Sequence, residues 1–215
     1  MRADDAQGVL AIWNDVREGR EVLFEHWYNT EHFPERLAVP GFRLGRRYEA
    51  LDGAPRYFCA YFTDTPETLT SPAYLGRLND PTPLTRQVMT EAFANMTRTM
   101  CRRAVRFGAL MGAFCVTARF DQPLEEGLAR DTLAALAETD GVARCELWLS
   151  AEPGGAREAA AEEKLRGPDR KIAACAIVET VRAADAMRVR GDLSRAFGAR
   201  AEVGIYRLLC LLAAA

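Results

Sequence analysis

The sequence is poor in histidine and lacks the motifs that mark several enzyme classes. Only 2 of its 215 residues are histidines. It contains no glycine-rich phosphate loop, no dinucleotide-binding fingerprint and no nucleophile elbow. Nucleotide chemistry is therefore disfavoured, and proton transfer near neutral pH is expected to start at one of the two histidines.

Neither sign of charge dominates, and long apolar runs are missing. The formal net charge is -2, so no overall field attracts nucleic acid or an anionic membrane. No apolar run approaches the roughly 20 residues needed to span a bilayer. Residues 1–8 are polar and acidic, unlike a signal peptide. We expect a cytoplasmic protein with no nucleic-acid partner and no membrane partner.

The sequence also lacks cysteines and histidines at the spacing of metal ligands. The 6 cysteines form no CxxC pair and fall in apolar, strand-like segments, which is typical of reduced, buried thiols. His26 and His32 are six residues apart and fall on different helix faces, whereas a helical zinc pair needs a spacing of three or four residues. We therefore expect no metal and no other cofactor.

Both histidines lie in one segment, residues 25–42. Its apolar residues recur at helical spacing, and in a regular helix Glu25, His32 and Glu35 share one stripe. A carboxylate on that stripe could fix the tautomer of His32 and leave its other nitrogen free for a ligand. Pro34 is expected to kink or restart the helix, because it has no N–H to donate and disfavours helical geometry at Phe33.

The rest of the chain repeats one order of elements twice. Strands are predicted over 8–15, 42–50, 56–63 and 95–107, and again over 110–120, 143–150, 171–180 and 203–212. Helices are predicted from about 18 and 65, and over 124–138 and 183–197, while 151–168 reads as a long, partly helical loop. Each half therefore has the order β-α-β-β-α-β, with a boundary near Gly108.

This order predicts an α+β fold made of two ferredoxin-like units, 8–108 and 109–213. Each unit has a four-stranded antiparallel sheet with both helices on one face. The strands are apolar on both sides, so the bare sheet faces are expected to pack on each other as an intramolecular, barrel-like pseudo-dimer. A further homodimer is optional, because the chain already supplies both halves.

The first half resembles EthD-like and uncharacterised members of the dimeric α+β barrel superfamily. The likeness rests on the run Trp27-Tyr28-Asn29-Thr30-Glu31-His32-Phe33-Pro34-Glu35-Arg36, on Pro40-Gly41-Phe42 and on Arg46-Arg47-Tyr48-Glu49. The resemblance implies a pocket for a small, aromatic or polyketide-like molecule between the sheet and the first helix. Its residues would be Trp27, His32, Arg47 and Tyr48. The second half matches only in element order, and its first helix has no histidine.

Two interpretations of these residues stay open. In the functional one, His32 is a catalytic acid or base oriented by Glu25 or Glu35, Tyr48 is a second catalytic residue, and Trp27, Arg47 and Glu35 bind substrate. In the structural one, His32 stabilises the chain at Pro34. The arginines of the second and fourth strands are interpreted as charges that protect exposed sheet edges.

The predicted function is a cofactor-free enzyme of monooxygenase, cyclase or isomerase type. Its substrate would be an aromatic or polyketide-like compound. The alternative is a non-catalytic small-molecule binding protein or a stress-related α/β-barrel protein. Fold alone does not choose between them.

The incomplete ligand sets generate a first prediction. Purified protein is expected to carry no stoichiometric metal, haem or flavin, because the sequence offers neither a paired histidine site nor a cysteine cluster. Elemental analysis and a visible absorption spectrum check this. A bound metal at one equivalent, or a Soret or flavin band, would contradict it.

Overall fold

The computed structural model describes residues 5–154 and 158–214. The elements of the first half are β1 (Gly8–Val16), α1 (Glu21–Trp27), η2 (Tyr28–His32), α2 (Phe33–Leu37), β2 (Phe42–Asp52), β3 (Tyr57–Thr63), η3 (Pro66–Thr70), α3 (Pro72–Asn79), α4 (Pro83–Glu91) and β4 (Phe93–Phe107). Those of the second half are β5 (Phe114–Phe120), α5 (Glu126–Ala137), β6 (Val142–Ser150), α6 (Ala161–Arg166), β7 (Ala174–Thr180), α7 (Ala183–Phe197), η4 (Gly198–Arg200) and β8 (Glu202–Ala213). The predicted order of strands and long helices is confirmed, with shifted ends. Within the predicted loop 151–168, residues 155–157 lie outside the described residues.

All eight strands form one closed barrel in the order β1-β3-β2-β8-β5-β7-β6-β4. The strands of each half are contiguous in it, as β4-β1-β3-β2 and as β8-β5-β7-β6. The halves meet through two antiparallel pairings, β2 with β8 and β4 with β6. The predicted α+β class and barrel are confirmed, and the halves join by strand pairing at both edges as well as across the barrel interior.

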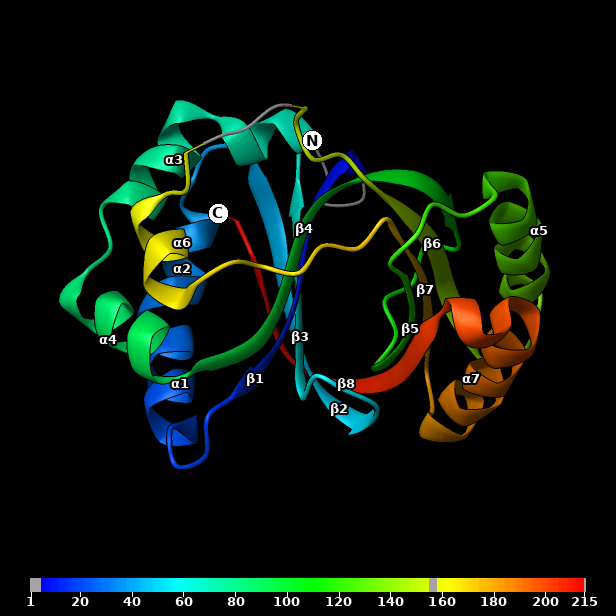
Figure 1. Ribbon diagram of the computed structural model, residues 1–215. Coiled ribbons are helices and arrows are strands. Elements are labelled where there is room, and N and C mark those ends of the chain that lie inside the picture. The colour runs from blue at the N-terminus through cyan, green and yellow to red at the C-terminus, as the bar shows by residue number, and fades with distance from the viewer. Residues whose placement is uncertain (1–4, 155–157, 215) are drawn as a thin grey trace.

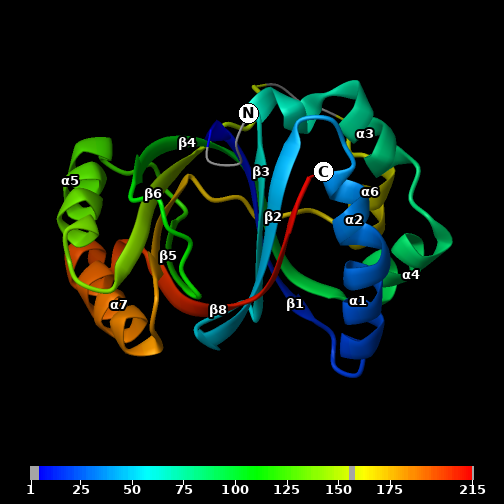
Figure 2. The same ribbon diagram turned by 180° about the vertical axis from the view of Figure 1, so that it is seen from behind.

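The helices cover two opposite sides of the barrel. Figure 1 shows α1, α2, α3, α4 and α6 on one side and α5 with α7 on the other. Figure 2 shows the C-terminal part of β8 running beside β2. Because β-strand side chains alternate between faces, each strand contributes both to the barrel interior and to a core beneath helices.

Closure of the barrel changes the interpretation of the arginines on β2 and β4. β2 and β4 each have a neighbour on both sides, so they are not the exposed edges that the sequence interpretation assumed. Arg46 and Arg103 are buried among barrel-interior residues, where they pair with Glu179 and Glu146. Arg47 and Arg98 are buried beneath the first helical layer. The edge-protection interpretation is wrong for Arg46, Arg98 and Arg103, whereas Arg47 was expected at the pocket instead.

The barrel interior is filled by aromatic rings and ion pairs. Phe58 stacks on Trp13 and on Tyr48, with ring centroids 4.6 Å and 5.1 Å apart. Glu179 accepts from Arg46, and its other oxygen accepts from the backbone N–H of Gly112 at 2.8 Å. An eight-stranded barrel has an interior just wide enough for side chains. These groups therefore act as core.

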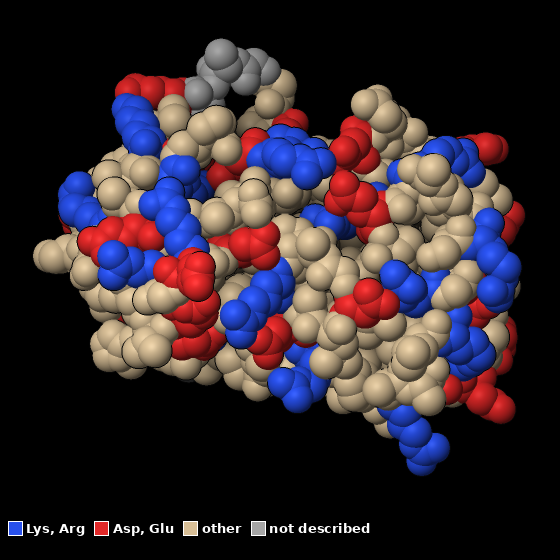
Figure 3. All heavy atoms as spheres, turned by 60° about the horizontal axis from the view of Figure 1, so that its bottom comes forward, with Lys and Arg blue, Asp and Glu red and all other residues tan. Residues whose placement is uncertain are grey.

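The surface carries charges of both signs. On the face seen in Figure 3, Lys and Arg side chains are interspersed with Asp and Glu. Among the described residues, none of the helices is both long enough and apolar enough to cross a membrane.

The buried Arg46–Glu179 pair generates a stability prediction. Arg46→Ala should lower the free energy of unfolding by about 3–5 kcal/mol, because it leaves a buried carboxylate without its counter-charge. Arg43→Ala is the matched control, since the Arg43–Asp64 pair is partly exposed and its loss should cost far less than that of the buried pair. Urea unfolding monitored by circular dichroism measures both. Equal costs for the two variants would show that the barrel-interior pair does not support the fold.

Candidate functional site

The segment that carries both histidines forms one continuous helical run, α1, η2 and α2. The η2 section is a π-helical turn, in which the N–H of Phe33 donates to the carbonyl of Tyr28. The chain stays helical through His32 and Phe33, and α2 begins at Phe33 with Pro34 in its first turn, so the helix restarts where the sequence predicted it. A proline ring clashes with the carbonyl four residues earlier in a regular helix, and the wider π turn just before Pro34 relieves that clash. π turns of this kind occur often at functional sites.

The π turn also explains why the predicted stripe of Glu25, His32 and Glu35 does not form a working unit. One extra residue in the turn rotates everything after it around the helix axis, so Glu25 and His32 no longer align. Glu25 accepts two hydrogen bonds from Arg47, at 3.1 and 3.2 Å. Glu35 accepts from Arg77. Neither carboxylate orients His32, and the Nδ1 of His32 has no hydrogen-bond partner.

Glycine at position 45 brings this helix close to the sheet. A Cβ built on Gly45 would lie 2.3 Å from the ring of Phe33 and 3.0 Å from a methyl group of Leu37. Only a residue without a side chain lets α2 approach β2 this closely. The close packing holds His32 against the sheet.

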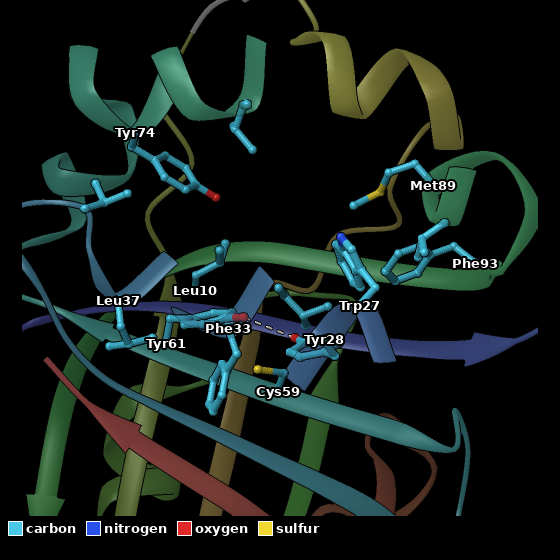
Figure 4. Close-up of a cluster of buried hydrophobic side chains, with 14 of the residues drawn as sticks. Leu10, Trp27, Tyr28, Phe33, Leu37, Cys59, Tyr61, Tyr74, Met89 and Phe93 are labelled. Atoms are coloured by element: carbon cyan, nitrogen blue, oxygen red, sulfur yellow. Dashed lines mark hydrogen bonds between the residues drawn. The ribbon is translucent and has the colours of Figure 1, made fainter. Parts of the chain in front are cut away.

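His32 lies in an aromatic cluster between the helices and the outer face of the sheet. The imidazole stacks on Trp27, with ring centroids 4.1 Å apart. Below it, the hydroxyl of Tyr61 donates to that of Tyr28 at 3.2 Å, and Figure 4 shows these two hydroxyls directed at each other. The Nε1 of Trp27 donates to Thr85 at 2.9 Å, which fixes the indole.

A small cavity opens beside the imidazole. Its volume is about 30 Å³. The residues that line it are Leu10, Ile12, Asn14, Tyr28, His32, Arg36, Tyr61, Tyr74, Leu78, Met89, Phe93, Met96, Arg98, Glu162 and Arg166. The lining combines an apolar body with a few polar groups, which is the composition of a small-molecule site. The present volume is about that of one water molecule, so an organic ligand needs part of the wall to move.

The electrostatics of the cavity keep His32 neutral. Burial lowers the pKa of His32 well below its usual range, and the positive charges of Arg36, Arg47, Arg166 and Arg98 act in the same direction. Burial likewise raises the pKa of Tyr28 and of Tyr61. The site therefore presents an unprotonated imidazole and two phenol groups in a positive potential. A neutral imidazole can accept a proton, and the potential stabilises a negative charge formed next to it.

The structure brings together some of the sequence-predicted residues and separates others. Trp27 and His32 are in contact. Arg47 is one layer away, with its guanidinium 3.8 Å from the centre of the Tyr28 ring. Tyr48 points into the barrel interior, because neighbouring residues on a strand face opposite sides. Tyr48 and Arg47 therefore cannot polarise the same substrate oxygen.

Sequence reasoning missed two important residues. Arg36 lies four residues after His32 and lines the same cavity, so helical spacing alone could have selected it. Glu162 comes from the second half of the chain, and no local pattern connects it with His32.

A second hollow offers fewer side chains that could take part in catalysis. A larger hollow of about 350 Å³ lies at the ends of α5 and α7, lined among others by Phe120, Leu128 and Phe197. It has no histidine. Within the described part of the chain, no group of three or more His, Cys, Asp or Glu side chains is placed to hold a metal ion.

Comparison with solved structures identifies the fold. An anthrone oxidase-like protein superimposes with a TM-score of 0.62 at 12% identity, covering 100% of this chain and 96% of its own. A candidate monooxygenase from Fusobacterium nucleatum gives 0.58 at 8% identity, with 97% and 95% covered. A candidate chlorite dismutase gives 0.55 at 11% identity, with 95% of each chain covered.

No protein-family model matches the sequence, and no curated protein matches it. At these low identities the structural matches establish the fold alone. The chain shares its fold with these three proteins.

The burial of neutral His32 generates a pH prediction. Its pKa is lower in the folded state than the reference value near 6.5. Below about pH 6.5 the unfolded chain therefore binds a proton that the folded chain excludes, and the free energy of unfolding falls by up to about 1.4 kcal/mol per pH unit. Above pH 7 the contribution vanishes.

Urea unfolding between pH 7.5 and 5 measures this effect. His32→Gln should lose stability less steeply than the wild type on acidification. His26→Gln is the control, because His26 is exposed, and it should follow the wild-type slope. Identical slopes for His32→Gln and the wild type would contradict a depressed pKa.

Proposed function

We propose that the protein is a monooxygenase-type enzyme whose substrate, an aromatic or polyketide-like compound, binds around His32. The observation that carries the proposal is the buried imidazole itself. It is 6% exposed, lacks a partner at Nδ1 and lines a cavity with three phenols and three arginines. A buried polar atom without a partner costs stability, so its retention suggests a role in binding or catalysis.

In this proposal His32 takes a proton from an acidic C–H or O–H group of the substrate. The substrate anion is stabilised by Arg36 and by hydrogen bonds from the phenols of Tyr28 and Tyr61. Dioxygen then oxidises the anion. For a methylene group the balance is CH2 plus O2 giving C=O plus H2O, with one oxygen atom in the product and the other in water.

The sequence-predicted residues have different roles in the proposed reaction. Trp27 positions the imidazole by stacking and could face an aromatic substrate. Arg47 acts through the ring of Tyr28. Glu35 is a positioning residue, since it binds Arg77 and lies 3.8 Å from Arg36. Tyr48 is on the other face of the sheet, so we leave it outside the reacting site.

The broader assignment follows from the barrel topology. We infer that the chain is a tandem of ferredoxin-like units, 8–108 and 109–213, of EthD-like kind, because each half contributes four contiguous strands in matching order. The six free cysteines fit a reducing compartment, which supports the cytoplasm as its location. A further homodimer remains compatible with this architecture.

One observation favours the alternative function, a non-catalytic binding or stress-related protein. The cavity of about 30 Å³ is too small for an aromatic ring in the present conformation. The enzyme proposal therefore requires that the roof of the cavity opens.

Oxygen consumption tests the proposal. Wild-type protein is incubated with anthrone and with a panel of polycyclic phenols, and oxygen uptake is recorded together with quinone absorbance. His32→Gln should lower kcat/KM by about 10²–10⁴-fold, the usual contribution of a general base. His26→Gln should match the wild type.

Two results would contradict the proposal. One is turnover that survives in His32→Gln at the wild-type rate. The other is the absence of both turnover and ligand-induced thermal stabilisation across the whole panel.

A further inference from the structure

The roof of the His32 cavity comes from the other half of the chain. After β6 the chain crosses from the second half to the first, and α6 packs against α3 and α4. Figure 1 shows α6 among the helices of the first half. Glu162 and Arg166 of α6 line the cavity together with His32.

A buried ion pair fastens this roof to the helix of His32. The Nη2 of Arg36 donates to both carboxylate oxygens of Glu162, at 2.5 and 2.7 Å. The two side chains are 2% and 3% exposed. One nitrogen thus makes both bonds, and the Nη1 of Arg36 is buried without a hydrogen-bond partner.

This arrangement leaves two unsatisfied polar atoms in one small space. They are the Nδ1 of His32 and the Nη1 of Arg36, on side chains four residues apart in the sequence that both line the cavity. Guanidinium groups match carboxylates best when both terminal nitrogens donate in parallel. The contact with Glu162 uses only half of that capacity.

We propose that Arg36 is the anchor for an anionic oxygen group on the aromatic ligand, and that Glu162 holds this place in the ligand-free protein. The inference rests on the proposed function for the location of the ligand, and it adds the chemical class: an aromatic compound that bears a carboxylate or phenolate. When the ligand binds, its anion replaces Glu162 on Arg36, and α6 moves away from the cavity.

The exchange is favourable on electrostatic grounds. Removing the nearest counter-charge of a buried arginine is destabilising. Glu35 lies 3.8 Å from the Nη1 of Arg36 but is already bound to Arg77, so the departure of Glu162 is favoured when another anion replaces it. A neutral ligand cannot do this. The roof thus selects for anionic ligands and closes the cavity when none is present.

The outer contacts of α6 allow such a movement. Arg98 reaches Glu163 at 3.3 Å and the hydroxyl of Tyr74 at 2.8 Å. Arg166 pairs with Asp169 at 2.8 Å, within the same crossing segment. The second pair can therefore travel with the roof. Arg98 is itself buried, so the movement of α6 has to keep Glu163 within reach of its guanidinium.

Calorimetric titration tests the proposal with two probes of one shape, 2-naphthoate and the neutral 2-naphthamide. Glu162→Gln removes the competing carboxylate and should lower the Kd for 2-naphthoate by at least about tenfold, because a larger fraction of the protein is competent to bind. Glu158→Gln is the matched control on an exposed acidic residue of the same segment, and it should leave the Kd unchanged. Arg36→Gln should abolish binding of 2-naphthoate. Titration with 2-naphthol above its pKa extends the test to phenolates.

Several outcomes would overturn the proposal. They are an unchanged or raised Kd for 2-naphthoate in Glu162→Gln, equal affinity of the wild type for naphthoate and naphthamide, or no binding of naphthoate by either protein. Circular dichroism verifies that each variant is folded, and Glu162→Gln decides the question if Arg36→Gln does not fold. These readouts need no turnover. If His32 proves not to be catalytic, the binding titrations can still be interpreted. If the titrations contradict the role of Arg36 and Glu162, the oxygen-uptake assay still tests the proposed function.

Discussion

The pairing of β2 with β8 and of β4 with β6 is the constraint on which the rest of the structure depends. These two seams close the sheet, and closure divides every strand into an inner and an outer face. The inner face is occupied by stacked aromatic rings and the Arg46–Glu179 pair. A ligand site among the residues of the first half must therefore lie on the outer face, between the sheet and its helices, which is where His32 lies.

Two local features make that position chemically useful. The π turn of η2 sets the direction of His32, and Gly45 lets the following helix lie close to the sheet. Together they place an imidazole among aromatic rings without giving it a carboxylate partner. Acidic residues pair with the arginines around it, and Glu162, the partner of Arg36, comes from the opposite half of the chain. The site is thus an assembly of both halves, although its candidate base belongs to one.

The sequence was a good guide wherever local pattern decides structure. Apolar residues on both sides of the strands, together with the repeated order of elements, predicted the barrel. It was a poor guide wherever a distant segment decides. The roles of Arg46 and Arg98 depended on barrel closure, and the position of Glu162 depended on the crossing segment. Tyr48 was misplaced because its resemblance to a family motif outweighed the alternation of side chains along β2. Pro34 marked the place where α2 begins, but the π turn before it was missed because it leaves no clear mark in residue spacing.

The central claim is that the outer-face cavity at His32 and Arg36 is the ligand site of this protein. A crystal structure of the protein soaked with 2-naphthoate tests it most directly. The account predicts the naphthalene ring against Trp27, the carboxylate on both terminal nitrogens of Arg36, and Glu162 displaced with α6. Density for the ligand elsewhere, such as in the hollow at the ends of α5 and α7, with Arg36 still bound to Glu162, would contradict the account.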